Sequence, residues 1–135
     1  NLADKQVFFG MEINHELIRM AEKNAPASTI YHDSAENIKT YLKKHNATKA
    51  DCIISTLPWA LFSPPYQKKL LHVIHENLAD GGEFITIAYT LGIHTKKGKS
   101  LRRLLSRHFT VQKTPTVWKN LPPAIFYHCT KPREN

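Results

Sequence analysis

ADCIISTLPW, residues 50–59, is the stretch that decides the fold of this chain. Cys52, Ile53 and Ile54 form a short apolar run rich in β-branched side chains, which is typical of a parallel strand covered on both faces. Pro58 ends the strand because it has no N–H to donate to a neighbouring strand. The stretch therefore predicts a buried strand followed by a rigid loop, which places Trp59 at the edge where α/β sheets bind ligands.

The loop at residues 57–59 has two interpretations. In the first, the carbonyl groups of Leu57 and Pro58 accept N–H groups of an amine, and the Trp59 ring offers its π-face to a positive charge. In the second, the loop is an ordinary connection from strand to helix, with Trp59 packed into the core. The stretch alone does not choose between them.

Length, composition and charge limit the class of protein. The chain has 135 residues, of which 41% are hydrophobic, so we expect one domain over residues 1–135 with a real core. No apolar run approaches the roughly 20 residues that span a bilayer, and residues 1–6 lack a signal-peptide pattern. We therefore expect a cytoplasmic protein in which Cys52 and Cys129 are reduced core residues. The net charge of +8 favours an anionic partner, either nucleic acid or an acidic membrane surface.

Strand-like and helix-like segments alternate along the chain. Strands are predicted at residues 7–13, 28–32, 52–56, 83–89, 109–118 and 124–130, with a break at Pro115 and a turn at Asp80–Gly82. Helices lie between the first five strands, and their predicted N-caps include Asn14, Asp33 or Ser34, and Ser63 followed by Pro64. This order predicts an α/β fold with a doubly wound, mostly parallel sheet, in which the last two strands pair antiparallel.

The order of elements resembles that of class I S-adenosylmethionine-dependent methyltransferases from their second strand onward, with a Rossmann-like sheet. Glu12 ends a strand at the position that holds the ribose hydroxyls in that family, and Asp33 with Ser34 matches the position beside the adenine. Leu78–Gly82 looks like the leucine-x-x-glycine-glycine turn of the family. Residues 55–59 and 118–124 look most like the phospholipid N-methyltransferase branch, which is related to the ribosomal RNA adenine dimethylases.

The resemblance implies a cofactor and a set of site residues. The cofactor is S-adenosylmethionine, and the residues expected to bind it are Glu12, Asp33, Ser34 and Ser55. The residues expected to be catalytic are Leu57, Pro58 and Trp59, and no metal is implied. His72 and His75 lie three residues apart, without a third ligand at metal-binding spacing.

One part of the family pattern is missing from the sequence. Only eleven residues precede Glu12, and none of residues 1–9 is a glycine, so the first strand, the glycine-rich loop and the first helix of the family have no counterpart. We therefore expect an N-terminally truncated methyltransferase fold that by itself binds S-adenosylmethionine weakly or not at all. We also expect another segment, such as a strand of a second copy in an exchanged homodimer, to fill the gap in the sheet.

Three functions follow as hypotheses. The preferred one is methylation of a phospholipid head-group amine, the second is methylation of an adenine amine in ribosomal RNA, and the third is a non-catalytic remnant that binds an anionic partner or a second copy. A cluster of cations would dock the chain on an anionic membrane, at a peripheral location, or on RNA; it could equally be a solvated helix face. Its members are Lys96, Lys97, Lys99, Arg102, Arg103 and Arg107.

Overall fold

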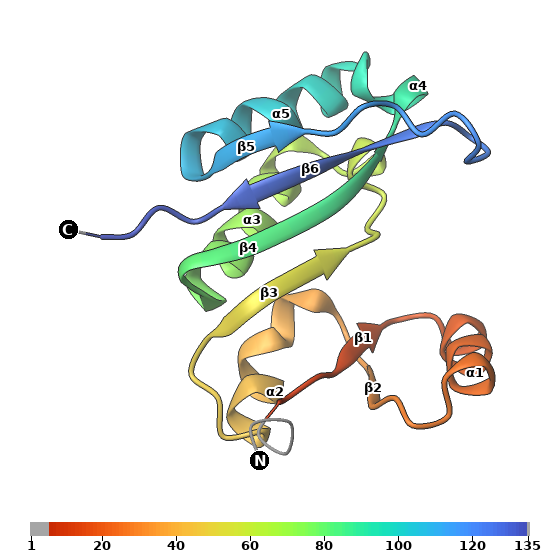
Figure 1. The fold of residues 1–135 in the computed structure, drawn as a ribbon, viewed down its shortest axis with the longest axis vertical. Coiled ribbons are helices and arrows are strands. Elements are labelled where there is room, and N and C mark those ends of the chain that lie inside the picture. Colours follow the sequence, from red (N-terminus) through yellow and green to blue (C-terminus); the bar gives the residue numbers. More distant parts are fainter. Residues whose placement is uncertain (1–5, 135) are drawn as a thin grey trace. The chain divides into compact units, whose positions relative to one another are not determined.

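The computed structural model describes residues 6–134 of the chain (Figure 1). Residues 1–5, which belong to the stretch without a signal-peptide pattern, and residue 135 lie outside the described residues. The chain divides into two compact units, Asn1–Thr48 and Lys49–Asn135. Whether residues 1–135 fold as one domain stays a prediction.

The first unit is a parallel pair of short strands with helices after each strand. Its elements are β1 (Gly10–Glu12), α1 (His15–Asn24), β2 (Ile30–His32), the 3₁₀ turn η2 (Ala35–Asn37) and α2 (Ile38–Lys44). β1 and β2 run parallel, with Gly10 opposite Ile30 and Glu12 opposite His32. Their carboxyl ends therefore lie at the same edge.

Side-chain caps start the helical segments of the first unit, as the sequence predicts. The side chain of Asn14 accepts hydrogen bonds from the backbone N–H groups of Glu16 and Leu17, at 2.9 and 3.4 Å. The hydroxyl of Ser34 accepts from the N–H of Glu36 at 3.3 Å, so Ser34 is the cap of the second segment. These bonds satisfy N–H groups that have no partner inside a helix.

An aromatic cluster packs β2 against α2 in the first unit. The rings of Tyr31 and Tyr41 stack with centroids 4.2 Å apart, and those of Phe9 and His45 stack at 5.1 Å. The hydroxyl of Tyr31 also forms a hydrogen bond of 2.7 Å with Nε2 of His45. Stacked rings of this kind contribute beyond the area they bury.

The second unit is a four-stranded sheet with its helices packed together. Its elements are β3 (Ala50–Ser55), the 3₁₀ turn η3 (Trp59–Leu61), α3 (Pro64–Asn77), β4 (Leu78–Tyr89), α4 (Thr90–Ile93), α5 (Lys96–His108), β5 (Thr110–Lys113) and β6 (Ala124–Thr130). The strand order is β3-β4-β6-β5, with β3 parallel to β4 and β6 antiparallel to both of its neighbours. The α/β fold with a C-terminal antiparallel hairpin is therefore confirmed.

The turn predicted at Asp80–Gly82 is an irregularity near the start of β4. Gly81 has a φ of +74°, in the left-handed region that favours glycine. The pairing with β3 shifts there, from Ala50 opposite Leu78 to Cys52 opposite Glu83. The chain thus bends at these glycines within the strand.

The strand predicted at residues 109–118 is shorter in the structure, because β5 ends at Lys113.

The core of the second unit lies between the sheet and the two long helices. Leu70 and Leu71 of α3, Leu105 of α5, and Phe84 and Ile125 of the sheet are at most 1% exposed. Figure 1 shows α3 and α5 side by side on one face of the sheet. In the described part of the chain, no helix has the length and apolar character needed to cross a membrane.

Two expectations about β3 are wrong. They are that both faces of the strand are covered and that Cys52 is a core residue. Cys52 is exposed and Ile54 is 71% exposed, while Ser55 is buried. The reason is that α3 and α5 cover the same face of the sheet, so alternate side chains of β3 have no helix over them within this unit. Cys129, in contrast, is a buried free cysteine as predicted, and burial raises the pKa of its thiol to about 12.

Candidate active site

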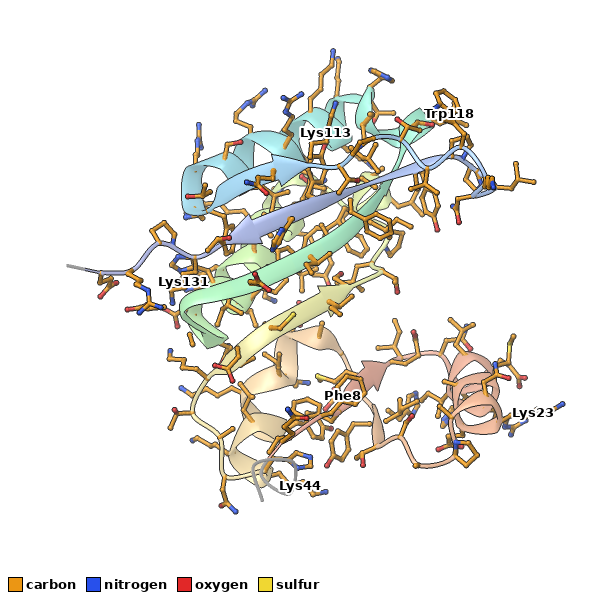
Figure 2. The ribbon with its side chains drawn as sticks, in the orientation of Figure 1. Phe8, Lys23, Lys44, Lys113, Trp118 and Lys131 are labelled. Carbon is orange, nitrogen blue, oxygen red and sulfur yellow. The ribbon has the colours of Figure 1, made fainter. Side chains whose placement is uncertain are left out.

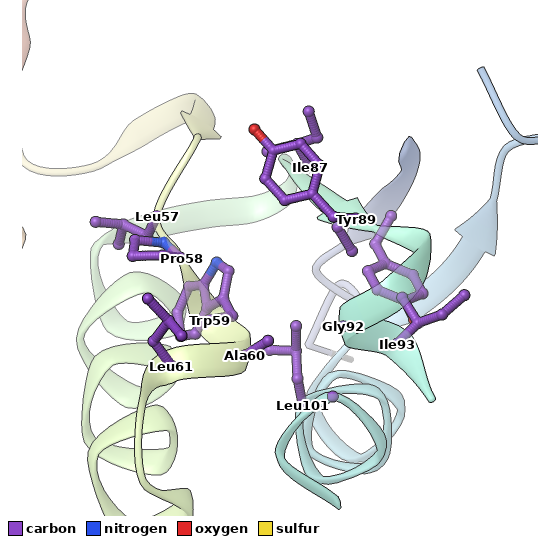
Figure 3. A pocket seen from close by; sticks show the side chains of 13 residues that line it. Leu57, Pro58, Trp59, Ala60, Leu61, Ile87, Tyr89, Gly92, Ile93 and Leu101 are labelled. Atoms are coloured by element: carbon purple, nitrogen blue, oxygen red, sulfur yellow. The ribbon is translucent and has the colours of Figure 1, made fainter. Parts of the chain in front are cut away.

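A pocket opens at the carboxyl ends of β3 and β4 (Figure 3). Its volume is about 280 Å³. It is lined by the loop after β3, the end of β4, α4, the first turns of α5 and one residue of β6. The residues are Leu57, Pro58, Trp59, Ala60, Leu61, Ile87, Ala88, Tyr89, Gly92, Ile93, Gly98, Leu101 and Tyr127. None of these side chains is charged, so the pocket suits an apolar group.

Trp59 belongs to the core as well as to the pocket wall. The residue is 2% exposed, and its indole N–H donates a 3.0 Å hydrogen bond to the hydroxyl of Thr86. Its ring packs edge-on against Phe62 and Phe84, with centroids 5.9 and 6.3 Å apart. The structure thus shows the core packing of the second interpretation of this loop. A role for Trp59 in stabilising charge on a substrate stays a prediction.

Hydrogen bonds within the loop hold Leu57 and Pro58 in place. The carbonyl of Leu57 accepts from the N–H of Trp59, and the carbonyl of Pro58 accepts from the N–H of Leu61, each at 2.9 Å. The buried hydroxyl of Ser55 accepts from the N–H of Leu57 at 3.2 Å. A carbonyl oxygen has two lone pairs, so both carbonyl groups can still accept an N–H from an amine.

Gln67 is a functional candidate that the sequence reasoning missed. Its side chain is fully buried, and its amide nitrogen donates 2.9 Å hydrogen bonds to the carbonyls of Trp59 and Lys97. Gln67 therefore ties the pocket loop to the first turn of α5. Its spacing from Leu70 and Leu71 on the apolar face of α3 was the signal that could have indicated a buried polar role.

Glu12 lies at the carboxyl end of β1, and backbone N–H groups hold one of its carboxylate oxygens in place. Its Oε1 accepts hydrogen bonds of 2.9 Å from the N–H groups of Ile13 and Asn14. Among the described residues, Oε2 has no hydrogen-bond partner. A carboxylate held in this way presents a free acceptor at a fixed position, as the recognition of a hydroxyl group requires.

Asp33 follows β2 and forms three hydrogen bonds through its carboxylate. Oδ2 accepts from the Tyr41 hydroxyl at 2.6 Å, while Oδ1 accepts from the Asn37 amide and the Ser34 N–H, both at 2.7 Å. The bond from Tyr41, followed by those from Asn37 and Ser34, lowers the pKa of Asp33 below its ordinary value. The same bond raises the pKa of Tyr41. Tyr41 was not predicted, because nothing in the sequence signals this contact across α2.

The structure groups the predicted site residues by unit. Glu12 and Asp33 lie together at the carboxyl edge of the first unit, where the N–H of Asp33 donates to the Glu12 carbonyl at 3.1 Å, and Ser34 follows directly. Ser55, Leu57, Pro58 and Trp59 lie together in the second unit, between β3 and η3. The roles assigned to all seven residues stay predictions.

Sequence comparison identifies no relative: no family model matches the chain, and no curated protein matches it. Solved structures do match. The chain is similar to an rRNA methylase from Streptococcus thermophilus, with a TM-score of 0.62 and 15% identity, over 93% of this chain and 73% of that one. It is similar to the N-methyltransferase NodS from Bradyrhizobium japonicum, with a TM-score of 0.70 and 11% identity, over 91% of this chain and 72% of that one.

A third similar structure is a SAM-dependent methyltransferase from Methanosarcina mazei, with a TM-score of 0.67 and 12% identity, over 93% of this chain and 82% of that one. Structural similarity at sequence identities this low shows the fold and does not show the substrate. The chain therefore has the fold of the class I S-adenosylmethionine-dependent methyltransferases.

Proposed function

We propose that this chain is part of an enzyme that transfers a methyl group from S-adenosylmethionine to an amine, preferably the head-group amine of a phospholipid. The observation that carries the proposal is the pair of acids, Glu12 and Asp33, at the carboxyl ends of adjacent parallel strands in a methyltransferase fold. In α/β sheets this is the edge that binds ligands. The structure of NodS with S-adenosyl-L-homocysteine is among the similar ones, which supports the choice of cofactor.

The residues present suit such a cofactor. Oε2 of Glu12 is free to accept a ribose hydroxyl, and Oδ2 of Asp33 keeps one lone pair beside the Tyr41 hydroxyl for an adenine amino group. Ser34 keeps the turn after β2 in shape through its cap. When bound, S-adenosylmethionine supplies an electrophilic methyl group on a sulfonium.

The pocket loop would orient the amine. The carbonyls of Leu57 and Pro58 would accept N–H bonds from a neutral amine, which would fix the orientation of its lone pair. In such a transfer a C–N bond would form as the C–S bond of the cofactor breaks, and the methylated amine would then give one proton to solvent. Because the buried residues Trp59, Thr86 and Gln67 hold the loop, these carbonyls are already oriented before a substrate arrives.

The pocket and the charge favour a phospholipid among amines. The pocket walls are apolar, which suits the non-polar part of an amphiphile. Lys96, Lys97 and Lys99 at the start of α5 follow closely in the chain and suit its phosphate or an anionic membrane surface. We include in this proposal a cytoplasmic protein attached peripherally to a membrane.

The alternative substrate is an adenine amine of ribosomal RNA. It is favoured by the similarity to an rRNA methylase and by the net charge of +8. The third hypothesis, a non-catalytic remnant that binds an anionic partner or a second copy, predicts no methyl transfer to either substrate.

Methyl transfer can be measured with the longest natural polypeptide that contains this sequence. We expect labelled methyl groups from S-adenosylmethionine to enter phosphatidylethanolamine in vesicles, and not ribosomal RNA. Labelled RNA would favour the alternative, and an absence of label in both would favour the remnant.

A titration of the same natural polypeptide with S-adenosylhomocysteine tests the cofactor site separately. Glu12→Gln is expected to weaken binding at least tenfold, about 1.4 kcal/mol, because a neutral amide is a poorer acceptor for the ribose hydroxyls. Glu16→Gln is the matched control, since Glu16 is an exposed acid of α1 that pairs with Arg19. Equal affinity for all three proteins would refute the role of Glu12.

A further inference from the structure

Four large apolar side chains stand exposed around the mouth of the pocket. Leu61 is 75% exposed, Leu91 79%, Trp118 73% and Leu121 90%. They come from η3, from α4 and from the connection between β5 and β6. We call these four residues the apolar rim.

Backbone contacts place the segments of the rim at one end of the sheet. Tyr89, at the end of β4, lies opposite Ala124, which in turn forms a bridge with Val117. The N–H of Thr90 donates to the carbonyl of Pro123 at 2.9 Å. The connection that carries Trp118 and Leu121 therefore lies beside the end of β4 and the start of α4, where the pocket opens.

The part of the chain that carries Leu91, Trp118 and Leu121 bears positive charge alone. Residues 84–133 hold ten lysines and arginines and no aspartate or glutamate. Lys96, Lys97 and Lys99 follow α4 within a few residues, at the start of α5, and all three are exposed. Among the described residues none of these three lysines forms an ion pair. The rim is thus an apolar patch bordered by unpaired cations.

We infer that the apolar rim inserts into the interfacial layer of an anionic phospholipid bilayer, with the pocket mouth facing the lipid. Leucine side chains gain by leaving water for the acyl boundary, and tryptophan favours the head-group level. Cations beside an apolar face bind the phosphates of anionic lipids. Single-stranded RNA would stack on Trp118, but the three leucines offer it no stacking surface. The rim therefore fits a bilayer better than a nucleic acid.

This inference rests on the proposed function only for the identity of the substrate. If a lipid amine is methylated, a pocket mouth held against the bilayer lets the lipid enter without leaving the membrane. Docking itself needs no cofactor and no catalysis, so it can be measured separately from methyl transfer.

The two tryptophans of the chain make the test specific, because Trp118 is exposed and Trp59 is 2% exposed. Vesicles of phosphatidylglycerol and phosphatidylcholine are added to the unmodified chain. We expect tryptophan emission to shift to shorter wavelength and to be quenched by lipids brominated near the head group. The Trp118→Phe variant, which retains only the buried Trp59, is expected to show neither change.

Substitutions at the rim and in the adjoining charge test the two contributions. Leu91→Ser with Leu121→Ser should weaken vesicle binding at least tenfold, with circular dichroism unchanged, because both side chains are exposed. Lys96→Gln with Lys97→Gln should weaken it and reduce its dependence on salt.

The charge-matched control is Arg107→Gln with Arg133→Gln. Arg107 lies in the last turn of α5, and the Arg133 guanidinium lies beside Gly81, near the start of β4 and away from the pocket. Figure 2 shows Trp118 and Lys131, two residues before Arg133, at opposite ends of this unit. This control should retain more affinity than the lysine pair.

Three results would overturn the inference. They are equal binding to neutral and anionic vesicles, an unshifted Trp118 at saturating vesicle, and a shift caused by RNA but not by vesicles. Vesicle binding without methyl transfer would support the docking surface and refute the proposed function. Methyl transfer to a soluble amine without vesicle binding would support a methyltransferase and refute the docking surface.

Discussion

The buried hydroxyl of Thr86 on β4 connects the pocket loop to the sheet through two hydrogen bonds. The Thr86 hydroxyl accepts from the Trp59 indole at 3.0 Å and donates to the carbonyl of Ser55 at 3.2 Å. Thr86 is 0% exposed, so no water can replace these bonds. At the scale of residues, this hydroxyl group is therefore one of the buried groups that hold the loop conformation.

Thr86→Val tests this dependence. The substitution keeps the shape of the side chain but leaves the Trp59 N–H and the Ser55 carbonyl without this partner. We expect the free energy of unfolding to fall by about 1–3 kcal/mol, measured by circular dichroism in denaturant. With Trp59→Phe added, the combined loss should be less than the sum of the two single losses; additive losses would argue against the coupling.

The carboxylate of Asp33 makes the first unit sensitive to acid. Its pKa in the folded chain lies below the ordinary value of 3.8, chiefly because Tyr41 donates a hydrogen bond to it. The ionised form therefore stabilises the fold above about pH 4, and this stabilisation is lost as the pH falls through the lowered pKa. In a carbon-13 NMR titration we expect the Asp33 midpoint below 3.8, and we expect Tyr41→Phe to raise it. An unchanged midpoint in Tyr41→Phe would contradict this cause.

At the scale of elements, the end of α3 depends on a lysine from the far end of the chain. Lys131 is 8% exposed, and its ammonium donates 2.9 Å hydrogen bonds to the carbonyls of His75 and Leu78. It also lies 3.6 Å from a carboxylate oxygen of Asp80. A cation at this position gives two carbonyl groups at the helix end a charged donor and interacts favourably with the helix dipole.

Lys131→Met should therefore destabilise the second unit. We expect a loss of about 2–3 kcal/mol in the free energy of unfolding, because two carbonyl groups lose a charged donor in a buried place. Lys49→Met is the matched control: Lys49 donates to the carbonyl of Glu76 at the same helix end, but it is exposed. Its loss should be clearly smaller. Equal losses would mean that burial does not decide the effect.

At the scale of the whole molecule, the strands form two sheets. β1 pairs with β2 in the first unit, and the order β3-β4-β6-β5 in the second unit puts β3 at one end of its sheet. β3 is consequently an edge, with the exposed side chain of Ile54 on it. We propose that this edge accepts a further strand, for instance from a second copy.

Hydrogen exchange at different protein concentrations tests this proposal. If a second copy adds a strand, the amides of residues 52–55 should exchange more slowly as the concentration rises, while light scattering reports a larger mass. Ile54→Lys should abolish both changes, because a charge on an edge strand disfavours pairing. Thr110→Lys on β5, the opposite edge of the same sheet, should leave them intact. A constant monomer mass with constant exchange would refute the exchanged dimer.

The sequence by itself determined the order of elements and the residues at their ends. Asn14, Ser34 and Ser63 cap helical segments as predicted, since a cap depends on hydrogen bonds to N–H groups only two or three residues away. The strand at residues 50–55 follows from its short apolar run. The antiparallel pairing of β5 with β6 follows from the absence of a helix between the last two strands.

Only the tertiary structure decided which faces are covered and which polar groups meet. Cys52 and Ile54 are exposed because α3 and α5 lie on the same face of the sheet, which the period of a strand cannot show. The contacts of Thr86 with Trp59, of Gln67 with Lys97, and of Tyr41 with Asp33 join residues 27, 30 and 8 positions apart. Such contacts depend on how elements pack, and local sequence patterns carry no information about packing at that distance.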